Sequence, residues 1–112
     1  MPVWIPWALL FASIALEIIA TTFLRLSNGF EKISYGLIGF ACMAVCLYIF
    51  SHAAKYIPSG VTYSIWSGFG IVAISIIGVK FFGDILTWKH YFFIALILIG
   101  AIGLMLSTEI RR

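Results

Sequence analysis

Four long apolar runs occupy almost all of the 112-residue chain and decide what it can fold into. They cover about residues 3–24, 33–54, 61–81 and 88–106. A helix needs roughly 20 apolar residues to cross a hydrocarbon layer of about 30 Å, and each run is long enough. Transmembrane β-strands alternate apolar and polar residues, a pattern that these continuous runs lack. We therefore expect one all-α membrane domain, residues 1–112, with four transmembrane helices.

Composition leads to the same class of protein. Hydrophobic residues make up 63% of the chain and charged residues only 10%, whereas soluble domains carry about 25% charged residues. The net charge of +3 comes from a few Lys and Arg in the loops and the tail, without a basic surface interleaved with aromatics, so a nucleic-acid partner is not expected. The first run contains an acid and follows no basic segment, which disfavours a cleaved signal peptide.

The basic residues give almost no preference for one membrane orientation. Four spans place both termini and the second loop on one side, and the first and third loops on the other. Three basic residues lie on the first side and four on the second, namely Lys55, Arg111 and Arg112 against Arg25, Lys32, Lys80 and Lys89. Because excess Lys and Arg mark the cytoplasmic side, a chain so balanced is expected to insert in both orientations. The competing interpretation is a weak bias toward an outside C-terminus, fixed by a sister subunit.

Glu17, near the middle of the first run, is the strongest functional candidate. A carboxylate in hydrocarbon costs at least a few kcal/mol, so such residues usually face a bundle interior or a wet cavity. There the carboxyl can bind either a proton or a cation, and the two compete. The alternative is a structural acid satisfied by a hydroxyl or by Arg25, although Arg25 is about 12 Å further along the helix axis. Small and polar residues share the helical face of Glu17, which indicates a cavity: Ser13, Ala20, Thr21 and Leu24.

The third run carries a similar stripe that includes Tyr63 and Ser67, with Trp66 three residues after Tyr63. Aromatic faces bind organic cations at about 0.5–2 kcal/mol each, although lipid packing is the commoner role of an aromatic in such a run. Cys42 and Cys46 have the wrong geometry for a disulfide if both lie on one helix, and we interpret them as small apolar packing residues. The sequence has no catalytic constellation, metal cluster or cofactor motif, so we expect neither an enzyme nor a cofactor.

Two segments resemble the small multidrug resistance family. The first is Ala15-Leu16-Glu17-Ile18-Ile19-Ala20-Thr21-Thr22, which continues to Arg25, Ser27, Gly29 and Phe30; the second runs from Tyr56-Ile57-Pro58-Ser59-Gly60 through Trp66-Ser67-Gly68-Phe69-Gly70-Ile71. The resemblance covers the whole chain, including its length and its four spans.

The resemblance implies an antiparallel, dual-topology dimer in the cell's inner membrane, whose paired glutamates exchange protons for a cationic substrate. Glu17 matches that glutamate, and Tyr63 and Trp66 match the aromatic binding positions. Gly68 and Gly70 match a bend in the third helix. Gly100, with Ala101 beside it, matches the dimerisation stripe of the fourth helix.

Three departures from the family pattern bear on specificity. Arg25 stands in place of a lysine, Met43 in place of a substrate-facing tyrosine, and Phe93 in place of the first glycine of the fourth-helix stripe. The start of the second helix, Tyr35-Gly36-Leu37-Ile38, resembles the subunits that work in pairs and export polyamines. The guanidinium-exporting branch fits less well, because Ser13, the Thr21-Thr22 pair and Ser67 depart from its pattern.

The leading hypothesis is a proton-coupled exporter of organic cations such as quaternary ammonium compounds, with Glu17, Tyr63, Trp66, Ser13, Thr21, Ser67 and Met43 at the site. The alternatives are polyamine export by a heterodimer with a sister subunit, guanidinium export, a flippase for a lipid-linked sugar, and a purely structural membrane subunit. A flippase would not require Glu17 together with the two aromatics. A structural subunit would show no proton coupling.

Overall fold

The computed structural model describes residue 2 and residues 4–108, which form four α-helices: α1 (Trp4–Leu26), α2 (Ile33–Ala53), α3 (Ser59–Phe81) and α4 (Trp88–Ser107). Each is long and apolar enough to cross a membrane, which confirms the prediction of an all-α, four-span protein. The described helix ends lie within two residues of the predicted ones. The predicted start at Val3 and the tail residues Arg111 and Arg112 lie outside the described residues.

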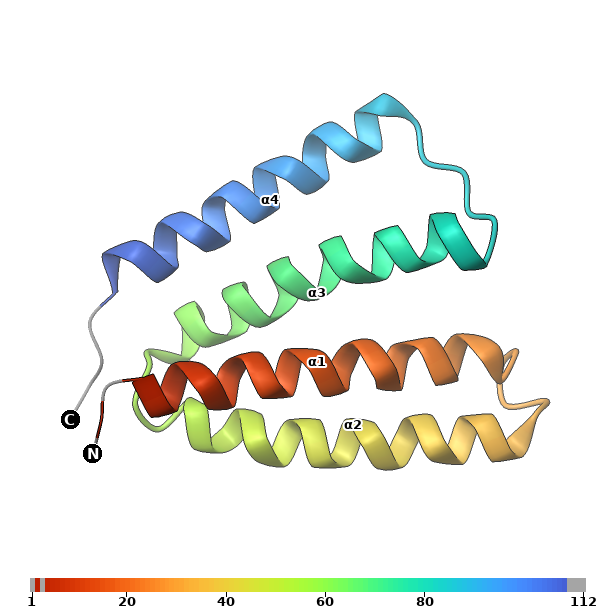
Figure 1. Cartoon of the computed structure of the whole chain (residues 1–112), viewed down its shortest axis with the longest axis horizontal. Helices are drawn as coiled ribbons and strands as arrows, with labels where there is room; N and C mark the ends of the chain where they lie inside the picture. Colours follow the sequence, from red (N-terminus) through yellow and green to blue (C-terminus); the bar gives the residue numbers. More distant parts are fainter. Residues whose placement is uncertain (1, 3, 109–112) are drawn as a thin grey trace.

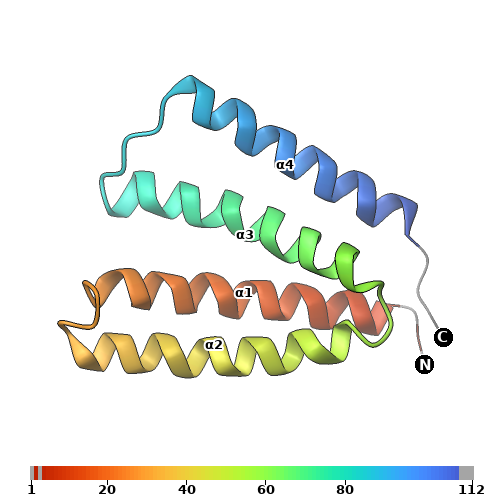
Figure 2. The same ribbon diagram turned by 180° about the vertical axis from the view of Figure 1, so that it is seen from behind.

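The helices stand side by side in the order α2, α1, α3, α4, as the two opposite views show (Figure 1, Figure 2). The molecule measures 44 × 34 × 17 Å along its principal axes. A helix with its side chains is about 10–12 Å wide, so the slab is little more than one helix thick. The α1–α2 and α3–α4 loops lie at one end of the slab, and the α2–α3 loop lies at the other (Figure 1).

Small residues set the closest helix contacts. A Cβ atom on Gly39 of α2 would lie 2.9 Å from both the Ala20 carbonyl oxygen and Leu24 Cγ, so α1 and α2 can approach only because Gly39 has no side chain. A Cβ atom on Gly68 of α3 would lie 2.8 Å from the Cβ of Ala101 of α4. Van der Waals packing of this kind drives helix association in lipid, where the hydrophobic effect between helices is absent.

Most apolar side chains face outward. The buried apolar core cluster is small and consists of Leu10, Ile14, Ala53, Ile57, Ile65 and Ala101. In the most apolar 18-residue stretch of α4, only 6% of the residues are buried. The first loop turns through Asn28, Gly29 and Phe30, all with positive φ, as the Asn28-Gly29 pair predicts. One chain thus leaves both faces of the slab to lipid or to a partner.

Candidate functional site

A groove of about 420 Å³ runs between α1 and α3 and is open on one side. Its walls are formed by two residues of α1 and six of α3: Glu17, Thr21, Trp66, Ser67, Gly70, Ile71, Ile74 and Ser75. Periodicity places these side chains together, since Glu17 and Thr21 are four apart on one helix, and Ser67, Ile71 and Ile74 are three or four apart on the other. The groove is apolar apart from the Glu17 carboxyl and the hydroxyl groups of Thr21, Ser67 and Ser75.

The carboxyl group of Glu17 lies against the backbone of α3. Its Oε1 accepts a hydrogen bond of 3.2 Å from the Thr21 hydroxyl. Its Oε2 is buried and finds no hydrogen-bond partner within the described part of the chain. A Cβ atom on Gly70 would lie 2.6 Å from this oxygen, so the carboxyl fits only because residue 70 is glycine. One carboxyl oxygen is therefore hydrogen-bonded to Thr21, and the other is buried against Gly70 without a hydrogen bond from the described residues.

Trp66 lies between the groove and a second hollow. Its ring stacks on Tyr63, with centroids 5.8 Å apart, and meets Phe50 edge-on at 5.5 Å. These three aromatics and Leu47 line the second hollow, of about 260 Å³. The Trp66 indole N–H is buried, and no described residue accepts a hydrogen bond from it. Tyr63 itself is 61% exposed, so the aromatic wall continues from the groove to the surface of the slab.

The structure brings four of the predicted site residues together in the groove and separates the others from it. Glu17, Thr21, Trp66 and Ser67 line it, and Tyr63 reaches it through its stack on Trp66. Two predicted residues, Ser13 and Met43, do not line it. Ser13 faces α2: its hydroxyl donates to the Leu10 carbonyl, and its own carbonyl accepts from the Cys46 thiol.

The face of α1 that we expect to line one cavity is divided between two neighbours. Glu17 and Thr21 face α3, whereas Ala20 and Leu24 pack on Gly39 of α2. Helical spacing groups residues within an arc but leaves open which neighbour lies against each part of it. The two cysteines are free, and Cys46 is buried.

The glycines singled out in α3 and α4 lie in different surroundings. Gly68 contacts α4 through Ala101, and Gly70 contacts Glu17 of α1, so the two face opposite neighbours within a continuous helix. Ala101 is buried inside the chain at 3% exposure. Gly100 is exposed and has open space around it. The bend in α3 and the dimer contact of α4 stay predictions.

Arg25, Asp84 and Phe82 form a cluster at the loop end of the groove that sequence reasoning did not find. The Arg25 guanidinium donates to both Asp84 oxygens, at 2.8 and 3.1 Å, and its Cζ lies 4.7 Å from the centre of the Phe82 ring. The hydrogen bonds from Arg25 hold the pKa of the Asp84 carboxyl below its usual range. Nothing local in the sequence links the two charged partners, because 59 residues separate them.

Charge and chemistry make the groove suited to a cation. Glu17 is its single ionisable wall residue among those described, and no Lys, Arg or His lines it there. Aromatic faces and hydroxyl oxygens supply the remaining favourable contacts. No cluster of three potential metal ligands occurs within residues 4–108.

Comparison with known proteins gives relatives that align over nearly the whole chain. A spermidine export protein, MdtI, of Citrobacter koseri is 38% identical over 104 residues, which cover 93% of this chain and 95% of that protein. The quaternary ammonium compound-resistance protein QacG of a Staphylococcus species is 39% identical over 100 residues, covering 89% and 94%. A guanidinium exporter of Proteus vulgaris is 33% identical over 102 residues, covering 91% and 98%.

The family model described as Small Multidrug Resistance protein matches residues 5–97, which include all of α2 and α3 and most of α1. This match, the whole-length relatives and the four apolar helices agree with one another. The chain is therefore a multi-pass membrane protein that belongs to the small multidrug resistance family of transporters.

Proposed function

We propose that the chain is a proton-coupled antiporter that exports small organic cations, such as quaternary ammonium compounds, across the cell's inner membrane by alternating access. One observation supports this above all others. The Glu17 carboxyl lies midway along a membrane-spanning helix, in an open groove, with one oxygen free of hydrogen-bond partners among the described residues. Acidic residues inside membrane spans usually belong to an ion or proton pathway, because any other placement is costly.

In the proposed mechanism a proton and a cation exclude one another at Glu17. The ionised carboxylate attracts a cation into the groove, where the rings of Trp66 and Tyr63 add about 0.5–2 kcal/mol each. Thr21 orients the carboxylate through its hydrogen bond to Oε1, and Ser67 offers a polar wall opposite. Protonation removes the charge and releases the cation. When the loaded groove faces alternate sides of the membrane, inward proton flow drives outward cation flow.

A second subunit completes the site in this proposal. The groove opens on a face of a slab whose spans are at most 22% buried, so a single chain cannot shield Glu17 and a bound cation from lipid. The three-to-four count of basic residues favours an antiparallel pair. We propose that the exposed face of α4, including Gly100 and Phe93, makes the contact, within a homodimer or with a sister subunit.

The test is transport by purified protein reconstituted in lipid vesicles with a pH gradient and radiolabelled tetraethylammonium. Glu17→Gln is expected to reduce uptake to the level of empty vesicles, because the amide cannot exchange a proton. Glu17→Asp is expected to keep transport but to shift its dependence on pH. Glu31→Gln is the matched control, since Glu31 lies in an exposed loop and accepts a hydrogen bond from Asn28. Unchanged gradient-driven uptake by Glu17→Gln would refute the proposal.

A second candidate is polyamine export by a pair of different subunits. The observation that favours it is the 38% identity to a protein named a spermidine exporter, over 93% of this chain. One groove carries a single acid, whereas a polyamine carries several positive charges, so such a substrate suits a site to which a second subunit adds a further acid. Spermidine export that requires a co-expressed sister subunit would favour this candidate. Tetraethylammonium export by this chain alone would favour the first.

A further inference from the structure

The loop end of the groove already holds an organic cation, the guanidinium of Arg25. It makes a bidentate pair with Asp84, at 2.8 and 3.1 Å, and lies over the Phe82 ring at 4.7 Å. A carboxylate and an aromatic face are the two kinds of group that proteins commonly combine to bind organic cations. Both partners are half-exposed, with side-chain exposures of 50% for Arg25 and 39% for Asp84, so another cation can approach them.

The loop after α3 folds back to create this arrangement. The backbone N–H groups of Phe82 and Asp84 both donate to the Gly78 carbonyl, at 3.1 and 3.0 Å. A Cβ atom on Gly78 would collide with the Asp84 carboxylate, so the turn needs glycine at that position. Gly83 has φ of +72°, which also favours glycine. The backbone that carries the Asp84 carboxylate and the Phe82 ring is therefore fixed by contacts that do not involve Arg25.

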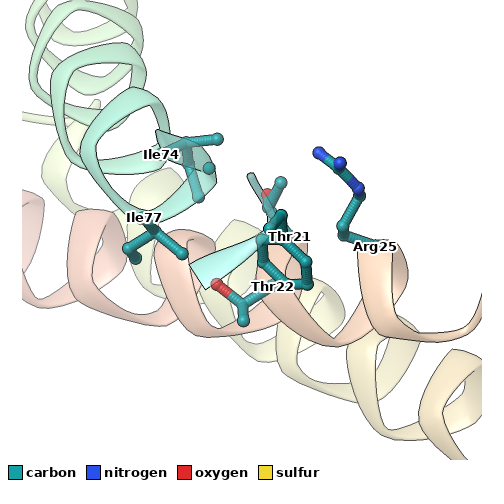
Figure 3. A pocket seen from close by; sticks show the side chains of 7 residues that line it. Thr21, Thr22, Arg25, Ile74 and Ile77 are labelled. Atoms are coloured by element: carbon teal, nitrogen blue, oxygen red, sulfur yellow. The ribbon is translucent and has the colours of Figure 1, made fainter. Parts of the chain in front are cut away.

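A small cavity lies between this end and the Glu17 groove. A cavity of about 80 Å³ lies between the end of α1 and α3 (Figure 3) and is lined by Thr21, Thr22, Arg25, Ile74, Ile77, Gly78 and Phe82. It shares Thr21 and Ile74 with the Glu17 groove. Thr21, which donates to Glu17, is one helical turn from Arg25. The two hollows thus follow one another along the same side of α1.

We propose that Asp84 and Phe82 form an outer cation site at the end of the groove, which Arg25 occupies at rest and an entering or departing organic cation takes over. The inference rests on the proposed function, since it assumes that organic cations move through the groove. The planar fork of Arg25 shows which ligands suit the outer site: guanidinium and primary ammonium groups can donate to Asp84 and also lie over Phe82. A quaternary ammonium ion can use only charge and the ring.

Displacing Arg25 is energetically feasible. Exposed ion pairs contribute little net free energy, because solvent and side-chain entropy offset the attraction. Removing the competing Arg25 side chain is therefore expected to strengthen binding of an external cation about two- to fivefold. A purely structural ion pair predicts instead that cation binding is indifferent to both partners.

The experiment is an NMR titration of the full chain in lipid nanodiscs with methylguanidinium chloride, matched at each point by sodium chloride. The Glu17→Gln background removes the ionisable group of the groove. In this background we expect the amide signals of Phe82 and Asp84 to shift with methylguanidinium concentration and to reach a plateau. Adding Arg25→Gln should raise the affinity two- to fivefold, and adding Asp84→Asn should abolish saturation. Glu31→Gln is the control, because it removes one negative charge at the same end of the molecule without touching either hollow.

Equal affinities in the background and in the Asp84→Asn variant would overturn the proposal, as would shifts that follow salt alone. If Arg25→Gln does not fold, Arg25→Lys replaces it, since lysine keeps the charge without the bidentate fork. The comparison of affinities with and without Asp84→Asn then still tests the proposal. The proposed function fails separately, when Glu17→Gln leaves tetraethylammonium transport unchanged.

Discussion

Gly70 and Glu17 are the pair of residues on which the geometry of the groove depends. The Glu17 Oε2 occupies the volume that a Cβ atom of residue 70 would need, at 2.6 Å. The opposing atom belongs to the end of a side chain with rotatable bonds, so a larger residue would displace the carboxyl without breaking the helix packing. Residue 70 thereby controls where the charge of Glu17 lies.

Gly70→Ala is expected to leave the protein folded and to lower tetraethylammonium affinity several-fold, because the added methyl pushes the carboxyl away from α3. Transport in reconstituted vesicles measures the effect, and thermal unfolding in detergent monitors the fold. Gly60→Ala is the control on the same helix, since nothing lies within 4 Å of the added atom. Equal losses of transport in the two variants would contradict this explanation.

The sequence predicted the identity of the central residues better than their surroundings. An acid in the middle of an apolar run is visible without a structure, and so is its neighbour Thr21. The Arg25–Asp84 pair is not visible, because its partners are 59 residues apart and nothing local links them. Ser13 shares the helical face of Glu17 but contacts α2, a distinction that periodicity alone cannot make.

The α3–α4 contact depends on the absence of a side chain at Gly68. Gly68→Ala would place two Cβ atoms about 2.8 Å apart, and neither can rotate away. We expect a loss of about 1–3 kcal/mol in the free energy of unfolding, typical of overpacking. Ala101→Gly in the same chain should restore most of it. Unfolding curves in mixed micelles measure both variants, and additive losses in the double variant would show that the two residues are not in contact.

The loop between α3 and α4 is expected to become acid-labile through Asp84. Its pKa is lowered by the hydrogen bonds from Arg25, so the unfolded chain binds the proton more readily. The stabilisation is therefore complete above the ordinary aspartate value, about 3.9, and is lost as the pH falls through the lowered value. The thermal midpoint of the native chain should exceed that of Asp84→Asn by a constant margin near neutral pH, and this margin should vanish in acid. A difference in thermal midpoint that grows as the pH falls would contradict this prediction.

The element boundaries were predictable because apolar runs in membrane proteins end at polar and turn-forming residues. Asn28-Gly29 lies in the break between α1 and α2, and Pro58 directly precedes the first residue of α3, Ser59. The lateral order of the helices was not predictable from the runs, since the polar stripes of the first and third runs do not indicate where the second and fourth helices pack. It depends on glycine contacts such as Gly39 with Ala20, whose partners only three-dimensional packing identifies.

At the scale of the whole molecule, the balance of charge between the two ends predicts how the chain inserts. The first and third loops lie at one end (Figure 1), and these loops with the adjoining helix ends carry four basic residues, against three elsewhere in the sequence. We expect C-terminal reporter fusions to be active on both sides of the membrane in cells that express this chain alone. Reporter activity on one side only would contradict dual topology for this chain.

The thinness of the slab has a consequence for the life of the protein in the cell. In the proposed dimer the second chain covers the groove, so a newly made, unpaired copy leaves the Glu17 groove and its hydroxyl groups open to hydrocarbon. Exposed polar groups of this kind are unfavourable in lipid and have no remedy within one chain. The copies that persist are then those that have paired, which couples the steady-state amount of each subunit to the supply of its partner.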